Sequence, residues 1–399
     1  MTMTGENIVC FAKEWTEDPT SNNHVMRTLA RHNNVLWLNS VGTRNPDLGS
    51  GRDLRKMARR LLGFFTPPQQ VEERLWVYSP IVLPLPYSAV AVAVNKWILR
   101  ATIALLRRAL GMREFQLWTF LPTASKYVGI LGESLAVYYC LDEWSQFSRV
   151  DGERIAVMEQ EICRKADVVF AISRTLLDRK TPYNPETHLA THGVDHVHFA
   201  AALDTATPPP ADLAGLPRPI VGFMGLIEEW IDLDLMAYVA EKRPDWSVVL
   251  VGRPAVDVSK LRRYPNVHLL GHRLYQELPR YCKEFAVGTC PFVSNELTRA
   301  VNPIKLREYL SAGLPVVSTD MPAVRDYSQW CRIATTPEAF LAACEAAIRE
   351  DTPERRRACS EAMRNETWQY KVEVLGDTVM RVKARKMELA REALLPGKT

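Results

Sequence analysis

The sequence predicts an α/β protein made of two parallel-sheet domains that face a central cleft. Three observations support this prediction. Short apolar runs that suit buried strands alternate with helical patterns along most of the chain. The alternation is interrupted at residues 204–219, which are rich in Pro and Ala, and then starts again. A chain of 399 residues is also too long for one ordinary core, whereas two domains of roughly 150–200 residues each are typical.

The predicted organisation places a first domain at residues 1–200, a linker at 201–218 and a second domain at 219–369. A long, mostly polar helical pattern runs from about residue 370, and such a tail often packs back on the first domain. Other helices are expected at residues 22–32 and 153–165. The expected strands are residues 7–11, 35–38, 75–78, 116–120, 136–140, 167–172, 219–224, 247–251, 267–270, 287–291 and 315–319.

The composition narrows the function classes. Charged residues make up 24% of the chain and the net charge is +4, which excludes a disordered chain and a nucleic-acid-binding composition. The eight cysteines are scattered without a C-x-x-C pair, as is typical of proteins in a reducing cytoplasm. The first residues lack the basic and apolar regions of a signal peptide, so we expect none.

Positive charge is concentrated between Arg44 and Arg113, which hold 12 Lys or Arg against 4 Asp or Glu. Within this region, Gly51–Phe65 has the pattern of a basic amphipathic helix, which suits an anionic membrane surface. A solvated helix that covers a core fits the pattern equally well. The apolar stretch Tyr87–Leu110 is interrupted by four Lys and Arg residues and is a poor membrane span. We therefore expect a cytoplasmic protein, with peripheral binding at the inner face of the cell membrane as an option.

The segment AVNPIKLREYLSAGLPVVST predicts a helix that can bind an anion. Asn302 suits the N-cap, and the free amides of Ile304 and Lys305 form an anion site together with the helix dipole. The dipole disfavours a cation in the first turn, so Lys305 is best explained by an anionic ligand. Glu308 lies about one turn further on, where a carboxylate can accept hydrogen bonds from two ribose hydroxyls. The alternative is an ordinary capped helix with a Lys305–Glu308 salt bridge.

This segment resembles the signature of GT-B glycosyltransferases, particularly the retaining family 4 and its relatives. In that family the motif E-x7-E is followed by a helix, a Gly and PVV. Glu308 matches the second Glu, which binds the donor ribose there, but Ala300 stands where the first Glu is expected. The xanthan glucuronosyltransferase departs similarly, and its Lys at the position of Lys305 contacts the nucleotide. The resemblance implies a GT-B fold and a UDP-linked sugar donor. The sugar and the stereochemistry stay open.

Further donor contacts are expected after the strands of the second domain. Gly225 ends a strand, so its loop can approach a phosphate closely. The family usually has Arg and Lys after this glycine, but LIEE stands here. Arg253 or Arg273 is the candidate to replace that cationic clamp, and each is also explained as a surface residue. The resemblance places Arg273, Leu274 and Tyr275 where relatives read the base, largely through backbone groups.

Catalytic candidates follow a buried strand of the first domain that runs to Cys140. Asp142 and Glu143 come after this strand, at the edge where ligands of parallel sheets bind. The resemblance to the xanthan enzyme favours Asp142 as the catalytic base, with Glu143 as the alternative. A carboxylate there also favours an oxocarbenium-like transition state. The competing interpretation is that Asp142 merely caps a following turn.

Acceptor contacts are expected in the loop after the first strand. Thr20, Ser21, Asn22 and Asn23 are polar and can hydrogen-bond to sugar hydroxyls, although the two asparagines can also cap the next helix. His24 is a candidate for an acceptor or catalytic contact, or a satisfied core residue.

Two patterns resemble metal sites but predict none. The spacing of His192, His196 and His198 lacks nearby cysteines, and a helical setting points Asp232 and Asp234 apart. We therefore expect no metal and no cofactor, with the helix dipole and Lys305 stabilising the leaving diphosphate.

The leading hypothesis is a hexosyltransferase or glucuronosyltransferase of polysaccharide biosynthesis. It moves a sugar from a nucleotide diphosphate sugar to a saccharide or lipid-linked acceptor. A sugar-nucleotide epimerase of the same fold is the alternative enzyme, and a non-catalytic nucleotide-sugar-binding partner protein is the alternative outside catalysis.

Overall fold

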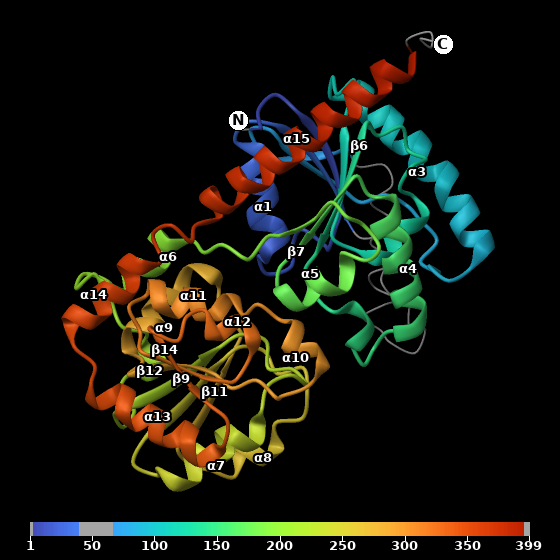
Figure 1. Cartoon of the computed structure of the whole chain (residues 1–399). Coiled ribbons are helices and arrows are strands. Elements are labelled where there is room, and N and C mark those ends of the chain that lie inside the picture. The colour runs from blue at the N-terminus through green and yellow to red at the C-terminus, as the bar shows by residue number, and fades with distance from the viewer. Residues whose placement is uncertain (1–2, 40–66, 395–399) are drawn as a thin grey trace. The chain divides into compact units, whose positions relative to one another are not determined.

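The computed structural model describes residues 3–39 and 67–394 and divides into two compact units (Figure 1). The first unit comprises residues 1–191 and 371–399, and the second comprises residues 192–370. The basic amphipathic segment expected at Gly51–Phe65 lies outside the described residues. In each unit, helices cover both faces of a central sheet.

The sheet of the first unit has the strand order β3-β4-β2-β1-β5-β6-β7-β8 within the described residues. All neighbouring strands are parallel except β3 and β4. Chain order reverses between β1 and β5, and ligands of such sheets bind at this switch point. The strands are β1 (Asn7–Ala12), β2 (Asn34–Asn39), β3 (Gln69–Glu72), β4 (Leu75–Tyr78), β5 (Gln116–Thr119), β6 (Leu135–Cys140), β7 (Val168–Ala171) and β8 (Thr187–Leu189).

The central strands of this sheet are buried on both faces, which explains why their sequences are continuous apolar runs. Side-chain caps start several of the helices that cover the sheet: Ser88 accepts from the Ala91 amide and Asp151 from the Arg154 amide. The helices are α1 (Ser21–Ala30), α3 (Ala89–Ala109), α4 (Gly152–Lys165), α5 (Arg174–Lys180) and most of α15 (Trp368–Leu394).

The second unit has a fully parallel sheet with the order β11-β10-β9-β12-β13-β14. This is the Rossmann order, and its switch point lies between β9 and β12. The strands are β9 (Ile220–Met224), β10 (Ser247–Val251), β11 (Val267–Gly271), β12 (Val287–Cys290), β13 (Val316–Thr319) and β14 (Cys331–Ala334). The helices are α6 (His196–Ala200), α7 (Leu233–Lys242), α8 (Ser259–Arg262), α9 (Leu278–Glu284), α10 (Glu296–Ala300), α11 (Ile304–Ser311), α12 (Pro322–Arg325), α13 (Pro337–Arg349) and α14 (Pro353–Ala362).

The C-terminal helix α15 is held on the first unit by ion pairs. Lys383 lies 2.8 Å from a carboxylate oxygen of Glu6, and Lys386 lies 2.8 Å from one of Asp167. Arg385 pairs with Glu186 at 2.7 Å.

The predicted fold class of two Rossmann-like units is confirmed. The sequence missed β3, β8 and β14.

Candidate functional site

Two glycines form a shelf at the edge of the second sheet. Gly225 follows β9 with φ +148°, and Gly252 follows β10 with φ +156°. A Cβ on Gly252 would lie 1.7 Å from the carbonyl oxygen of Gly225, so only glycine fits there. The amide of Gly225 also donates to the carbonyl of Val251 at 2.9 Å. At this edge of the second sheet, beside the switch point between β9 and β12, the surface is therefore formed by backbone rather than by side chains.

The start of α11 lies against this shelf. The Lys305 side chain passes Gly225 closely, because its Cε is 3.5 Å from where a Cβ on Gly225 would sit. Its ammonium donates to the buried carboxylate of Glu308 at 2.8 Å. The first-turn amides of α11 and its dipole add partial positive charge at the same end. The structure thus brings together Gly225, Lys305 and Glu308, and the salt bridge given as the alternative is present.

The loop after β6 presents a carboxylate without a hydrogen-bond partner. Asp142 is partly buried, and within the described residues nothing donates a hydrogen bond to its carboxylate. Burial, and then the charge of Glu159, raise the pKa of Asp142 to about 7. A carboxyl with this pKa can accept a proton near neutral pH. The capping alternative is wrong, because an N-cap carboxylate accepts from a helix amide.

Comparisons with known proteins identify the fold. Residues 218–350 match the family model described as glycosyl transferases, group 1. The trehalose 6-phosphate synthase of Burkholderia multivorans superposes with a TM-score of 0.65 at 12% identity, covering 96% of this chain and 100% of that one. The chain has the GT-B fold. The Anabaena protein HepE, in complex with UDP and glucose, has the same GT-B architecture, with a TM-score of 0.58 at 13% identity and coverage of 99% and 100%.

A sequence relative points the same way. TuaH of Bacillus subtilis, assigned to teichuronic acid biosynthesis as a glycosyltransferase, is 29% identical over 261 residues. The match covers 60% of this chain and 64% of TuaH, which is just under two thirds of that relative's length. The predicted resemblance to GT-B glycosyltransferases is confirmed.

Glu143 is a fixed ion-pair partner within the first unit rather than a proton acceptor. Its carboxylate accepts from Arg179 at 2.9 Å and from the Ser145 hydroxyl at 2.8 Å, and the Lys180 ammonium lies 3.8 Å away. Burial alone would raise the pKa of Glu143, but Lys180 and Arg179 hold it below its ordinary value. Asp142 is therefore the better candidate for the base.

Behind Asp142 lies a buried polar cluster that the sequence did not reveal. Glu159 accepts from Lys180 at 2.6 Å, from the Tyr138 hydroxyl at 2.6 Å and from the Cys140 thiol at 3.2 Å. Burial lowers the pKa of Lys180, but Cys140, Glu159 and Glu143 together raise it above its ordinary value. The four groups come from β6, α4 and α5, and no sequence spacing relates them.

The start of α1 uses part of the expected acceptor loop. Thr20 is the N-cap, and its amide donates to the Asn23 side chain at 3.1 Å in a capping box. Asn22 is buried and accepts from the Thr20 hydroxyl, and Ser21 is buried in the first turn. Asn23 therefore helps to start the helix as the N3 residue of the capping box, which is the alternative that the sequence left open for it.

Two further polar residues, His24 in α1 and Lys13 after β1, lie near this loop in the sequence. His24 is partly buried in α1, after β1, whereas Asp142 follows β6, and β5 separates these strands. Strand spacings of about 4.8 Å put the two strand ends roughly 10 Å apart. Lys13, which the sequence did not single out, follows β1 directly. Burial lowers its pKa to about 8, although Glu17 and Asp18 oppose the shift.

Two expected donor residues serve the fold instead. Asn302 is not the N-cap of α11, a position that Pro303 occupies. The Asn302 side chain accepts from Arg307 at 2.6 Å, and this buried guanidinium lies 4.9 Å from the Tyr327 ring. Arg273 is likewise engaged in contacts within the second unit. Its guanidinium donates to Asp212, to the Tyr281 hydroxyl and to the carbonyls of Leu270 and His272.

The other donor candidates differ in whether their polar groups are already bonded within the protein. Arg253 is exposed, and the described residues offer it no ion pair. The Leu274 amide donates to the Glu277 carboxylate at 2.9 Å. The Tyr275 ring stacks on His198 at 4.5 Å, and its carbonyl is bonded to the same imidazole. Of these groups, Arg253 remains available to a ligand. Ile304 begins α11 as expected.

The two metal-like patterns are explained by ordinary contacts. His196 Nε2 bonds to the Ser360 carbonyl at 2.9 Å, and His198 Nε2 to the Tyr275 carbonyl at 2.9 Å. Asp232 caps α7, and Asp234 pairs with Lys260 at 2.7 Å. Over residues 3–39 and 67–394, no cluster of three or more His, Cys, Asp or Glu is placed to hold a metal ion.

Proposed function

We propose that this protein is a glycosyltransferase that moves a sugar from a UDP-linked donor to a saccharide or lipid-linked acceptor in polysaccharide biosynthesis. The observation that carries the proposal is that Gly225, Lys305 and Glu308 lie together at the edge of the second unit, which contains the residues that match the group 1 glycosyl transferases. The UDP in the HepE complex supports the choice of nucleotide, and TuaH supports the polysaccharide setting.

The second unit is proposed to bind the donor. Lys305 and the N-terminus of α11 neutralise the diphosphate, which carries the charge that develops as the glycosidic bond breaks. Glu308 accepts hydrogen bonds from the ribose hydroxyls. Since Glu308 already holds Lys305 at 2.8 Å, the pair presents a cation and an acceptor at a fixed separation. Arg253 is an exposed second cation for the diphosphate.

The first unit is proposed to bind the acceptor and to supply the base. Asp142, with its pKa near 7, takes the proton of the attacking hydroxyl or stabilises positive charge on the sugar ring. Thr20, which is exposed in the chain segment after β1, is proposed to contact the acceptor. The enzyme is proposed to act in the cytoplasm.

A panel of nucleotide diphosphates tests the donor assignment. We expect UDP to raise the melting temperature, because a ligand at a hundredfold its Kd adds about 2.7 kcal/mol of stability. Incubation with UDP-sugars and a saccharide acceptor should then give a glycosylated product. Epimerised nucleotide sugar without acceptor would favour the epimerase instead, and binding with neither reaction would favour the partner protein.

Glu308→Ala is expected to weaken UDP binding about tenfold, which corresponds to roughly 1.4 kcal/mol for lost hydrogen bonds to a charged acceptor. The loss is moderate because Lys305, released from its ion pair, turns its full charge to the diphosphate. Calorimetry with UDP and with a uridine diphosphate that lacks the ribose hydroxyls separates the two roles. The defect should shrink with the second nucleotide, and an equal defect with both would make Glu308 structural.

Activity is expected to persist in excess EDTA, because Lys305 and the α11 dipole are proposed to perform the charge neutralisation that a divalent ion performs elsewhere. Transfer rates measured with EDTA, and after adding back magnesium or manganese, check this. Complete loss with EDTA that either ion restores would contradict the proposed metal independence.

A further inference from the structure

Helix α3 presents an apolar stripe to solvent. Its exposed apolar side chains recur at helical spacing, which places them along one side of the helix. The opposite side is buried in the first unit. The exposed residues are Val90 (74%), Val94 (40%), Trp97 (78%) and Leu105 (69%), and the buried ones are Ala91, Asn95, Leu99, Ile103 and Leu106.

The buried side fixes α3 to the unit. The Asn95 side chain accepts from the Leu83 amide at 2.7 Å and donates to the Leu83 carbonyl at 2.9 Å. By length and composition α3 also passes as a membrane span, with 21 residues and a mean hydropathy of 1.6 over its most apolar window. Crossing a bilayer would break the Asn95 contacts, so only the outward stripe is available to a partner.

Unpaired cations accompany the stripe. The sequence of α3 contains no Asp or Glu. Arg100 and Arg108 are exposed on α3, and Arg113 is exposed in the turn that follows. In the part of the chain that the structure describes, none of the three has an ion pair. This face therefore combines apolar surface with uncompensated positive charge, as interfacial helices do.

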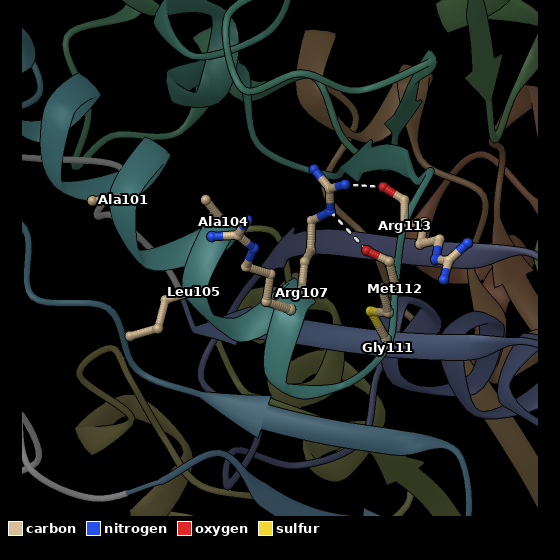
Figure 2. Close-up of a pocket in the computed structure, with 8 residues that line it drawn as sticks. Ala101, Ala104, Leu105, Arg107, Gly111, Met112 and Arg113 are labelled. Carbon is tan, nitrogen blue, oxygen red and sulfur yellow. Dashed lines mark hydrogen bonds between the residues drawn. The ribbon is translucent and has the colours of Figure 1, made fainter.

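The end of α3 also forms a hollow of about 820 Å³ (Figure 2). Small and apolar side chains, including Ala101, Ala104 and Leu105, line it together with Arg107, Arg108 and Arg113. Arg107 donates to the carbonyls of Met112, at 3.1 Å, and of Arg113, as the dashed lines show. This arginine is thereby used to hold the turn, which leaves Arg108 and Arg113 for a ligand. Guanidinium groups beside alkyl surface suit a lipid phosphate and its chain.

We propose that α3 and the turn at residues 111–113 bind the surface of a bilayer that contains anionic phospholipids. Trp97 and the apolar stripe enter the interface, where tryptophan is favoured, and the arginines contact the phosphates. Because this face of α3 is positively charged, an anionic bilayer fits it better than a neutral apolar partner does. The inference goes beyond the proposed reaction and does not depend on it, because binding requires neither donor nor turnover.

Flotation of the full chain with vesicles tests the proposal. The protein should float with phosphatidylcholine vesicles that contain phosphatidylglycerol, less so at high salt, and not with phosphatidylcholine alone. Arg100→Glu with Arg108→Glu should lower partitioning at least about 25-fold, since each interfacial Arg contributes about fivefold. The control is Arg262→Glu with Arg349→Glu, two exposed arginines of the second unit with the same change in net charge.

A second pair of variants tests the apolar stripe. Trp97→Ser with Leu105→Ser should abolish flotation, whereas Val157→Ser with Val374→Ser, at other exposed positions, should not. Thermal unfolding and UDP affinity of each variant show that it is folded. Equal loss in test and control pairs, equal binding to neutral vesicles, or a concentration-dependent dimer that the Trp97 and Leu105 changes dissociate would overturn the proposal. A chain that fails to bind UDP but still floats would refute only the proposed reaction.

Discussion

Asp142→Asn is expected to lower turnover by about 10²–10⁴-fold, the range for a positioned acid–base group, while UDP affinity stays near normal. The change keeps the shape of the side chain and removes its charge and basicity. Because the pKa of Asp142 is about 7, the wild-type rate should rise with pH up to that value and then level off. Steady-state kinetics with varied donor and pH check both statements. Near-normal turnover in the variant would move the catalytic role elsewhere.

The same substitution should stabilise the protein at high pH. The pKa of Asp142 is raised in the fold from 3.8 to about 7, so between these pH values the unfolded chain releases a proton that the folded chain keeps. The free energy of unfolding of the wild type therefore falls as pH rises through this window. Asn does not titrate, so its advantage should be near zero at pH 4. Above pH 7 it should reach on the order of 2–4 kcal/mol.

A matched variant separates charge loss from damage to the fold. Asp151→Asn changes an exposed N-cap carboxylate of the same unit, at a position where Asn and Asp serve alike. It should leave turnover and the pH dependence of stability unchanged. Denaturant unfolding at both pH extremes distinguishes the two variants, and equal stabilisation of both would show that burial of Asp142 is not the cause.

Lys305→Ala is expected to weaken UDP binding by about 10–150-fold, the equivalent of roughly 1.5–3 kcal/mol for a charge-assisted contact. The effect exceeds that of Glu308→Ala because the buried Glu308 carboxylate loses its partner and then repels the diphosphate. Calorimetry with UDP and with uridine measures it, and the defect should vanish for the uncharged nucleoside. Unchanged UDP affinity would remove Lys305 from the donor site.

Lys260→Ala is the control for this change. Lys260 pairs with Asp234 at 2.7 Å in the same unit, but both side chains are largely exposed. Its loss should leave UDP affinity unaltered and alter stability by less than about 1 kcal/mol. A double variant, Lys305→Ala with Glu308→Ala, should lose less UDP affinity than the sum of the two single changes, because removing Glu308 also removes the repelling carboxylate.

The central strands of both sheets could be predicted from the sequence because they are apolar on both faces, as in Val248–Val251. It missed β3, β8 and β14, whose partly exposed edge positions lack that signal. At the proposed donor edge, the contact between Lys305 and Glu308 could be predicted because the two residues share one helix at a fixed spacing. The capping role of Asn302 was wrong because its side chain is committed to Arg307, a buried partner that spacing does not disclose.

The surroundings of Asp142 were beyond the sequence for a different reason. Burial raises the pKa of Asp142 most, and the charge of Glu159 on α4 adds to the shift. Lys180, which donates to Glu159, belongs to α5. These contacts join segments far apart in the chain, so the environment exists only after the first unit has folded. The carboxylate was identified from its place after β6, but its raised pKa required the structure.

The Gly225–Gly252 shelf also bears on how donor preference can be engineered. No side chain fits at Gly252, so this part of the proposed donor edge presents only backbone. Donor selectivity must then depend on neighbouring positions whose side chains reach the surface, namely Leu226 and Glu229 after Gly225 and Arg253 after Gly252. Ile227 and Glu228, which lie between the first two, are buried. A library confined to the three exposed positions would therefore vary the proposed donor edge without disturbing the core.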